Sequence, residues 1–184
     1  MLFRSPPGCL PTLWQDDDRY VQSYLSQHPG YYVTGDGGRR DADGYLYVMG
    51  RIDDVINVAG HRLSTGTLEQ AVASHPAVAE CAVIGVHDEL KGQVPRGFVV
   101  LKAGSRVDED TLRAELVQLV RDQVGPVAAF RQVDIVPALP KTRSGKILRK
   151  TMRRSADGND EPVPSTIDDA AALDAMRPLL RGGG

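Results

Sequence analysis

The sequence predicts a small domain of the α/β or α+β class, in which flanking helices cover a sheet of a few strands. Two observations lead to this class. Apolar strand-like segments alternate with helical ones from about residue 55 to residue 154. A β-rich segment with several turn-forming glycines precedes them, at residues 31–50. Residues 1–30 carry large apolar side chains that so short a segment cannot enclose, so we interpret the start of the chain as the end of a larger domain.

The β-rich segment is expected to form a hairpin. Residues 31–33 and 45–48 are rich in aromatic and branched side chains, which favour strands. Residues 35–38 and 41–44 are turn-like. The second of these turns resembles part of a calcium loop, but Tyr45 stands where an oxygen ligand is required, so we interpret it as a plain hairpin turn.

The middle of the chain alternates strands and helices. Ser64 or Thr65 can cap a helix that ends before His75, since the next residue is a proline. Asp108 can cap a second helix, which has apolar residues on one face. The expected strands are residues 55–58, 81–86, 98–101 and 133–136, with Gly92 and Pro95 in a connection.

The end of the chain has a polar, proline-bearing stretch at residues 157–166, which we interpret as a linker. Residues 168–180 are expected to form a last helix that Pro178 limits.

Composition excludes several classes of protein. The 184 residues suffice for one ordinary domain and part of another. The hydrophobic share of 41% and charged share of 25% are typical of a soluble globular protein, and the net charge of −2 argues against a general polyanion binder. Cys9 and Cys81 lack the spacing of a disulfide framework or a zinc site. Without a signal peptide or membrane span, a cytoplasmic protein is expected.

A basic stretch at residues 138–154 carries the strongest chemical signal. Gly145 allows the backbone beside Lys146 to bend, and the apolar residues that follow can anchor a helix, which places a cation on a mobile loop. A solvated charged face is the plainer alternative. A phosphate loop is excluded because Pro140 and Ile147 replace residues that it needs. The stretch lacks interleaved aromatic residues, which disfavours nucleic acid as a partner.

Further charged residues lie near glycine-containing turns and element ends. Asp36, Arg51, Arg62 and Arg121 could, with Lys146, contact a nucleotide, because a carboxylate accepts hydrogen bonds from ribose and arginine binds phosphate through two bonds. Each of them, taken singly, also fits an ordinary surface charge. The residues alone therefore indicate a nucleotide or phosphate contact and no specific reaction.

Three segments together resemble a known family: GYYVTGDGG, DADGYLYVMGRIDDVINVAGHRLST and LPKTRSGKILR. They resemble the C-terminal third of AMP-forming acyl-CoA synthetases, members of the adenylate-forming superfamily, and look closest to the acetate and propionate–CoA ligases. The resemblance spans about residues 10–180. It implies a ligase that uses ATP, CoA and magnesium to form an acyl-adenylate and then an acyl-CoA, with AMP and pyrophosphate as by-products.

The resemblance also implies a domain organisation. Residues 1–53 would be the C-terminal end of the large adenylation domain, with a β-hairpin and the hinge. Residues 54–155 would be the mobile C-terminal α/β domain, or lid, which rotates between the two half-reactions, and residues 156–184 a linker and tail helix. The missing N-terminal adenylation domain would be its partner, and this chain alone would be nearly inactive because the acid and phosphate sites lie there.

The resemblance assigns roles to five residues in the adenylation site. Lys146 matches the adenylation lysine, whose ammonium stabilises charge that gathers on the α-phosphate. Asp36 matches the carboxylate that holds the ATP ribose, Arg51 a second ribose or phosphate contact, and Arg62 an ATP-contacting arginine. Asp53 matches the hinge. Acetylation of Lys146 would remove its charge, so a lysine acetyltransferase or deacetylase is a further expected partner.

CoA and metal contacts follow from the same resemblance. Ala59 and Gly60 match the loop that lines the pantetheine tunnel, and Arg121 matches a contact to CoA. The remaining three positions match a structural magnesium site in some relatives, the first and last through backbone carbonyls: Ala73, His75 and Val78.

Some features depart from the family and leave alternatives open. Arg39, Arg40 and Arg96 place charge where relatives are often apolar, as surface substitutions or as signs that a shielding partner surface is absent. The chain could instead be a non-catalytic interaction or regulatory module derived from such an enzyme. Within the ligases, a medium-chain or aryl-acid enzyme is the alternative to a short-chain one.

Overall fold

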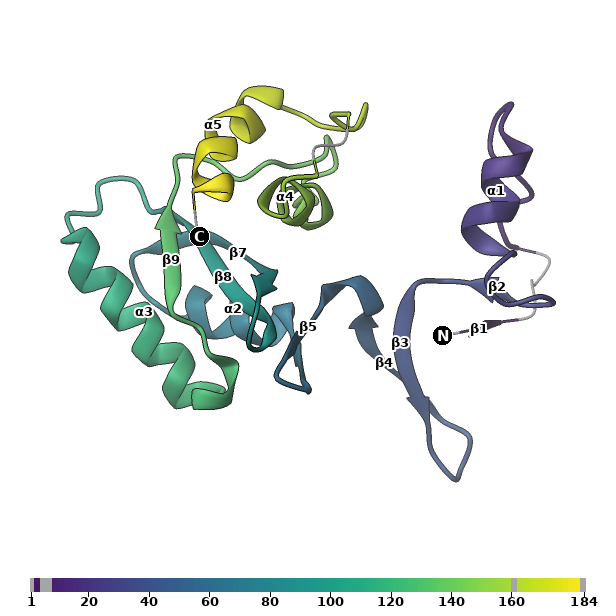
Figure 1. Ribbon diagram of the computed structural model, residues 1–184, viewed down its shortest axis with the longest axis horizontal. Coiled ribbons are helices and arrows are strands. Elements are labelled where there is room, and N and C mark those ends of the chain that lie inside the picture. Colours follow the sequence, from purple (N-terminus) through teal and green to yellow (C-terminus); the bar gives the residue numbers. More distant parts are fainter. Residues whose placement is uncertain (1, 4–7, 160–161, 183–184) are drawn as a thin grey trace. The chain divides into compact units, whose positions relative to one another are not determined.

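The computed structural model describes residues 2–3, 8–159 and 162–182, and the chain folds as two compact units. Unit 1 is Met1–Asp53 and unit 2 is Asp54–Gly184. Both contain helices and β-strands, which confirms the predicted mixed α/β class (Figure 1).

The described residues of unit 1 form one helix and two small antiparallel sheets. Strand β1 (Leu2–Phe3) pairs with β2 (Tyr32–Val33), and β3 (Asp36–Arg40) pairs with β4 (Leu46–Arg51). Several large apolar side chains of this unit are exposed: Trp14, Val21, Tyr45, Leu46, Val48 and Ile52.

Helix α1 (Asp17–Tyr24) was not predicted, although its start carries a clear signal. The Asp16 carboxylate accepts a hydrogen bond from the Arg19 amide, and Asp17 and Asp18 occupy the first turn. Acidic side chains at that end satisfy open amides and interact favourably with the helix dipole. The acidic residues 16–18 therefore mark the start of a helix.

Strand β3 corrects the expectation of a turn at residues 35–38. Its ladder with β4 shifts register between Gly37 and Gly38, and glycine is common at such irregularities. The expected turn at residues 41–44 is confirmed, because the Asp41 carboxylate accepts hydrogen bonds from the amides of Asp43 and Tyr45.

Unit 2 is built on one sheet with strand order β6-β5-β8-β7, and β9 lies alongside β8. All pairings in this sheet are antiparallel except that of β8 with β9, which is parallel. The strands are β5 (Val55–Val58), β6 (His61–Ser64), β7 (Val78–Asp88), β8 (Gly92–Leu101) and β9 (Gln132–Ile135). The helices are α2 (Thr65–Ala73), α3 (Glu109–Gln123), α4 (Arg149–Ala156) and α5 (Ala170–Arg181), with a short 3₁₀ turn η2 (Pro126–Ala128). A second 3₁₀ turn, η1 (Ile52–Asp54), spans the boundary between the two units.

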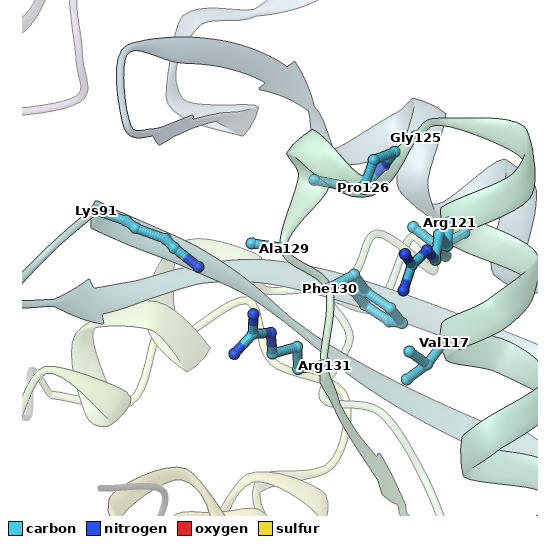
Figure 2. A pocket seen from close by; sticks show the side chains of 10 residues that line it. Lys91, Val117, Arg121, Gly125, Pro126, Ala129, Phe130 and Arg131 are labelled. Carbon is cyan, nitrogen blue, oxygen red and sulfur yellow. The ribbon is translucent and has the colours of Figure 1, made fainter.

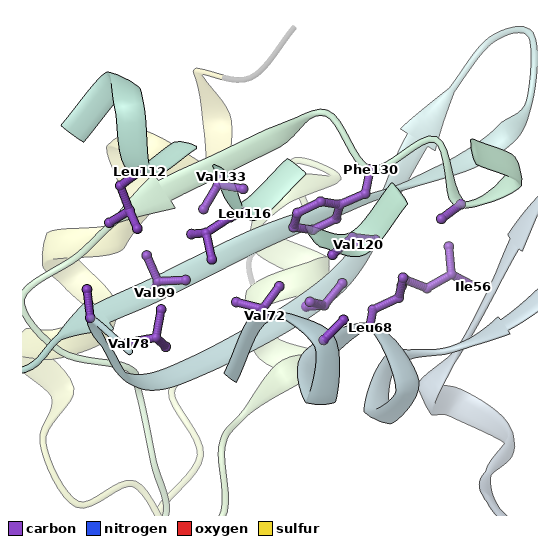
Figure 3. Packing of buried hydrophobic residues seen from close by; sticks show 14 of the residues in the cluster. Ile56, Leu68, Val72, Val78, Val99, Leu112, Leu116, Val120, Phe130 and Val133 are labelled. Carbon is purple, nitrogen blue, oxygen red and sulfur yellow. The ribbon is translucent and has the colours of Figure 1, made fainter. Parts of the chain in front are cut away.

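The two faces of the sheet carry separate cores, because successive strand residues point to opposite sides. Val83 and Val99 pack with α2 and α3 in the first core, which Figure 3 shows together with Leu68, Leu116 and Phe130. Their neighbours on the other face, including Ile84 and Phe98, pack against α4 and α5 in the second core. The second core consists of Ala82, Ile84, Phe98, Val136, Leu139, Met152, Met176 and Leu180.

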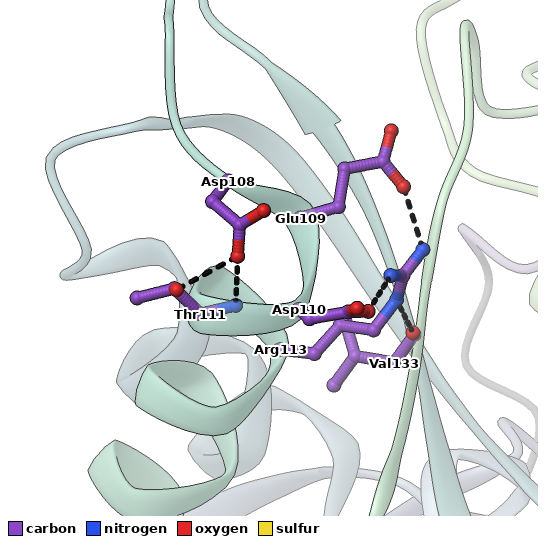
Figure 4. A network of polar contacts seen from close by, with 6 residues as sticks. All are labelled: Asp108, Glu109, Asp110, Thr111, Arg113 and Val133. Atoms are coloured by element: carbon purple, nitrogen blue, oxygen red, sulfur yellow. Dashed lines mark hydrogen bonds and ion pairs between the residues drawn. The ribbon is translucent and has the colours of Figure 1, made fainter.

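Helix α3 begins as the sequence predicts. The Asp108 carboxylate accepts hydrogen bonds from the amide and the hydroxyl of Thr111 (Figure 4). These bonds lower the pKa of Asp108. Arg113 follows one turn later and pairs with Glu109 and Asp110. The predicted cap is therefore confirmed.

Strands β7 and β8 are longer than predicted, and β6 was not predicted. Residues expected to form a connection lie inside β8, where Pro95 faces Gly85 of β7. A proline is tolerated there because β9 pairs only with Arg96–Val99 and β5 only with Gly92, so no strand pairs with Pro95 on that side.

Arg96 is not a surface substitution. Its side chain is only 3% exposed and its Nε donates to the Asp134 carboxylate at 2.7 Å. Arg39 lies at the surface over the ring of Tyr47, 4.2 Å from its centroid.

Among the described residues, no helix is long and apolar enough to cross a membrane.

Candidate functional site

Lys146 lies on a small closed hairpin, residues 140–148, which we call the lysine hairpin. The Thr142 amide donates to the Lys146 carbonyl at 2.8 Å, and the Lys146 amide donates to the Thr142 hydroxyl at 3.1 Å. Gly145 provides the positive φ of 80° at its tip. The loop that the sequence analysis expected to be mobile is thus hydrogen-bonded internally. The side chain of Lys146 is exposed, and its ammonium makes no hydrogen bond or ion pair within the part of the chain that the structure describes.

The root of the lysine hairpin is fixed by ion pairs. Arg149, the first residue of α4, forms a two-bond contact with Glu69 of α2, with both N–O distances at 2.7 Å. Glu69 also accepts a hydrogen bond from the Val83 amide in β7. Burial acts to lower the pKa of Arg149, but the Glu69 carboxylate offsets this and the net direction is upward. Lys141 pairs with Glu80 at 2.5 Å.

Cys81 borders the Glu69–Arg149 pair, and its thiol is expected to be unreactive. Its thiol donates to the Glu69 carbonyl at 3.4 Å. Burial, assisted by the Glu69 carboxylate, raises the pKa of Cys81 to about 11. A thiol with so high a pKa is almost wholly protonated at neutral pH and is a poor nucleophile or metal ligand.

Asp36 and Arg51 lie opposite each other in the β3–β4 ladder of unit 1. An Arg51 nitrogen is 3.9 Å from the Asp36 carboxylate and donates to the Thr34 carbonyl at 3.2 Å. Gly35 has a φ of 76°, and a Cβ there would lie 2.9 Å from the guanidinium. Glycine at this position therefore lets the arginine cross the chain next to the carboxylate.

Asp53 lies in the 3₁₀ turn η1 (Ile52–Asp54), between strands β4 and β5. The boundary between the two compact units falls directly after this residue. Its backbone is in a short turn and not in a sheet ladder, which is a position where a chain can change direction.

Ala59 and Gly60 form the tight turn between β5 and β6. Both have positive φ, 48° and 89°, as a type I′ hairpin turn requires. The Ala59 amide donates to the Lys91 carbonyl at 2.8 Å, which ties this turn to the tip of the β7–β8 hairpin. Arg62 lies on β6 opposite Asn57 and is exposed.

A cavity of about 250 Å³ lies beside Arg121, near the C-terminal end of α3. Lys91 and Arg131 line it as well, together with the ring of Phe130 (Figure 2). Three cations around a partly apolar hollow suit an anionic ligand with a flat or apolar part. Lys91 and Arg131 were not singled out by the sequence analysis, because the chain separates them from Arg121 and neither belongs to a motif.

The imidazole ring of His75, at the expected magnesium position, has no free lone pair. The Ala77 amide donates to Nδ1 at 3.2 Å, and Nε2 faces the Glu115 carboxylate at 3.0 Å. A metal would have to displace one of these partners. No group of three or more potential metal-ligating side chains occurs among residues 2–3, 8–159 and 162–182. The His75 ring is engaged by these partners as arranged, and the assignment of Ala73, His75 and Val78, the first and last through backbone carbonyls, stays a prediction.

The structure brings together some of the expected residues and separates others. Asp36 and Arg51 are neighbours in unit 1. In unit 2, the Ala59–Gly60 turn is linked through Lys91 to the cavity that Arg121 lines. Lys146 lies apart from them on the lysine hairpin, whose next residue, Ile147, packs against the second core.

Residues 67–146 match the AMP-binding enzyme C-terminal domain family. The chain is 49% identical over 181 residues to a propionate–CoA ligase of Escherichia coli, covering 95% of this chain and 29% of the ligase. It is 47% identical over 176 residues to mitochondrial acyl-CoA synthetase short-chain family member 3 of Mus musculus, covering 96% of this chain and 26% of that protein.

Among solved structures, acetoacetyl-CoA synthetase from Streptomyces lividans is similar with a TM-score of 0.74 and 27% identity, over 92% of this chain and 25% of that one. The chain thus spans between a quarter and a third of the length of these relatives. They confirm the resemblance inferred from the three motifs. The chain contains an AMP-binding enzyme C-terminal domain and is homologous to the C-terminal part of short-chain acyl-CoA synthetases.

Proposed function

We propose that this chain is the lysine-carrying C-terminal part of a short-chain acyl-CoA synthetase that acts on acetate or propionate. Together with an N-terminal adenylation domain, it would convert the acid, ATP and CoA into acyl-CoA, AMP and pyrophosphate. The single observation that carries this proposal is Lys146, an exposed cation without a partner among the described residues, on a hairpin whose backbone is closed by hydrogen bonds.

In the first half-reaction, a carboxylate oxygen of the acid attacks the α-phosphorus of ATP and the bond to pyrophosphate breaks. Negative charge gathers on the α-phosphate as the two anions meet. The Lys146 ammonium is proposed to stabilise that charge, which is most effective when the cation is already in place and not engaged elsewhere. Magnesium would accompany ATP as it does in the adenylate-forming enzymes, and no step is assigned to a metal at His75.

Three further residues are proposed to contact the nucleotide. The Asp36 carboxylate is proposed to accept hydrogen bonds from the ribose hydroxyls, and the neighbouring Arg51 guanidinium to contact ribose or phosphate. Arg62 is exposed on β6 and could reach ATP without breaking an ion pair that fixes the fold. Asp53 would act as the hinge, since the turn that contains it joins the two units.

In the second half-reaction, the CoA sulfur attacks the acyl carbonyl and AMP leaves. The Ala59–Gly60 turn is proposed to line the pantetheine path, since its backbone carries no bulky side chain. Arg121 would contact the phosphate-bearing end of CoA, and the adjacent Lys91 and Arg131 add positive charge at the same cavity. The hydrogen bond from the Ala59 amide to the Lys91 carbonyl joins the turn to the cavity, which supports the binding of one ligand at both.

A non-catalytic interaction module is the second candidate. The chain covers only 29% of the E. coli propionate–CoA ligase, and unit 1 exposes Trp14 and Tyr45, which would fit a surface that normally contacts another domain. A regulatory version of this candidate includes acetylation of Lys146 by a lysine acetyltransferase. A lid of a medium-chain or aryl-acid ligase differs from our proposal only in the acid.

A chimeric ligase tests the proposal. This chain would replace the matching C-terminal residues of the E. coli propionate–CoA ligase, and propionyl-CoA formation would be measured for the chimera, for the truncated N-terminal part and for this chain alone. We expect activity only in the chimera. A folded but inactive chimera, or acyl-CoA formation by this chain alone, would contradict the proposal. Activity recovered by mixing the two separate parts would favour the interaction module.

A further inference from the structure

The lysine hairpin has a second layer of support that comes from the end of the chain. The Arg143 amide donates to the Thr166 carbonyl at 3.0 Å, and the Asp168 amide donates to the Lys141 carbonyl at 2.8 Å. Thr142 and Ile167 form the antiparallel bridge between these two bonds. Residues 166–168 therefore pair with the outer arm of the hairpin. A hairpin alone is only marginally stable in water, so this added pairing matters.

Helix α5 fixes the paired residues 166–168 to the domain. The Asp169 carboxylate caps the helix by accepting a hydrogen bond from the Ala171 amide. Leu173, Met176 and Leu180 on one face of the helix are at most 2% exposed. Met176 and Leu180 belong to the second core, together with Leu139 at the base of the hairpin. Figure 1 shows α5 beside α4 in unit 2.

Arg96 holds the C-terminal end of α5. Its two terminal nitrogens donate to the carbonyls of Leu179, at 2.8 Å, and Leu180, at 3.3 Å. The last carbonyls of a helix lack partners within the helix, and they form the negative end of its dipole, so a buried guanidinium satisfies both. The Asp134 carboxylate on β9 pairs with the remaining Nε of Arg96 and compensates its charge.

We propose that residues 164–181 form a brace for the lysine hairpin, and that Arg96 is a positioning residue that anchors this brace through the end of α5. The brace lies outside residues 67–146, the part that matches the domain family. Its role in catalysis rests on the proposed function of Lys146, but its physical role in holding the hairpin does not.

The brace would act on the rate by fixing where the Lys146 ammonium lies. A misplacement of about 1 Å in a catalytic group can cost roughly a hundredfold in rate. The loss of one backbone hydrogen bond, in contrast, lowers the stability of the fold only modestly. Loosening the contact between the brace and the lysine hairpin should therefore reduce adenylation strongly while the two cores remain folded.

Amide hydrogen exchange on this chain tests the physical part. Asp168→Pro removes the amide that donates to the Lys141 carbonyl, and Asp168→Ala keeps it, so the two variants form a matched pair. We expect exchange at Thr142, Arg143 and Lys146 to rise by about tenfold or more in the proline variant, with sheet amides such as Val99 unchanged. Unchanged exchange at the hairpin in Asp168→Pro would overturn the brace.

The chimeric ligase tests the positioning role of Arg96. Arg96→Met should lower the adenylation kcat by roughly 10- to 100-fold with little change in the KM for ATP, while thioester formation from supplied propionyl-adenylate stays within about twofold. Arg96→Lys, which keeps a donor and the charge, should recover part of the loss. Arg113→Met is the matched control, because Arg113 also pairs with carboxylates and donates to a carbonyl, that of Val133, without touching the brace (Figure 4).

Two outcomes would overturn this role. If Arg96→Met lowered both half-reactions equally, the arginine would serve only stability, and if adenylation were unchanged, the brace would not position Lys146. If the unmodified chimera formed no adenylate, the proposed function would fail, and the exchange experiment would still decide whether the brace exists.

Discussion

Lys146 and Arg149 lie three residues apart in the same basic stretch, yet their surroundings are opposite. The Lys146 side chain is exposed, and its ammonium makes no contact among the residues that the structure describes. The Arg149 side chain is 24% exposed and is held by both oxygens of Glu69. One cation is available to a ligand, and the other is committed to joining α4 with α2.

The difference shows how a hairpin that is held in place by ion pairs of its neighbours can carry a lysine that makes no ion pair itself. A cation with a strong internal partner must lose that partner before it can bind an anion, which costs free energy. Lys146 avoids this cost because the ion pairs of its neighbourhood are made by Arg149 and Lys141. The chemistry should therefore depend on Lys146, and the stability on its neighbours.

The largest expected effect is on the chemistry of Lys146. In the chimeric ligase, Lys146→Ala should reduce the adenylation rate by about 10²- to 10³-fold, because it removes a charge that stabilises the transition state. In this chain, the same change should alter the free energy of unfolding by less than about 0.5 kcal/mol, as at other exposed positions. Pyrophosphate release and urea denaturation measure the two quantities, and a marked loss of stability would break the contrast with Arg149.

Cys81 tests how closed the region behind Arg149 is. Its pKa is raised from 9.0 to about 11, chiefly by burial, so between these two pH values the folded state keeps the proton that an unfolded chain loses. At pH 8, alkylation by iodoacetamide should be roughly a hundredfold slower than for an unburied cysteine, and should rise toward pH 11. Rapid modification of Cys81 in the folded chain at pH 8 would show that this region is open.

Arg149 should matter for stability. Arg149→Met leaves the Glu69 carboxylate, itself 15% exposed, without its ion-pair partner. We expect a loss of about 2 kcal/mol in the free energy of unfolding, less than for a fully buried pair because both groups retain some contact with water. Lys150→Met, at an exposed position next in the helix, is the control and should change stability little. Equal effects of the two substitutions would show that Arg149 contributes no more to stability than an exposed lysine.

The smallest effect is expected at the Lys141–Glu80 pair. Its side chains are 31% and 43% exposed. Glu80→Gln should lower the free energy of unfolding by less than about 1 kcal/mol, and added salt should reduce the difference further. A loss as large as that of Arg149→Met would mean that the outer ion pair also fixes the lysine hairpin.

The sequence was most informative where a residue acts through local chemistry. The cap at Asp108, the helix end before His75 and the turn at Asp41 follow from the residues nearest to them, and the structure has all three. The three motifs also indicated the family before any fold was known. Local signals are reliable here because each depends on a hydrogen bond made within a few residues.

The features that escaped prediction depend on contacts between distant residues. Arg96 resembles a surface charge in the sequence, but Asp134 and the end of α5 enclose it. Pro95 is tolerated inside β8 because β9 begins to pair at Arg96 and β5 pairs only with Gly92. The cavity around Arg121 includes Lys91 and Arg131, which no spacing rule connects. Such arrangements follow from the strand order and not from any one segment.

The most direct test of the account is to supply the intermediate. The chimeric ligase with Lys146→Ala would be given propionyl-adenylate and CoA, and its rate of propionyl-CoA formation compared with that of the unmodified chimera. We predict rates within about threefold of each other, because the Lys146 ammonium is required only while the α-phosphate is attacked. A loss of thioester formation as large as the loss of adenylation would contradict the role proposed for Lys146.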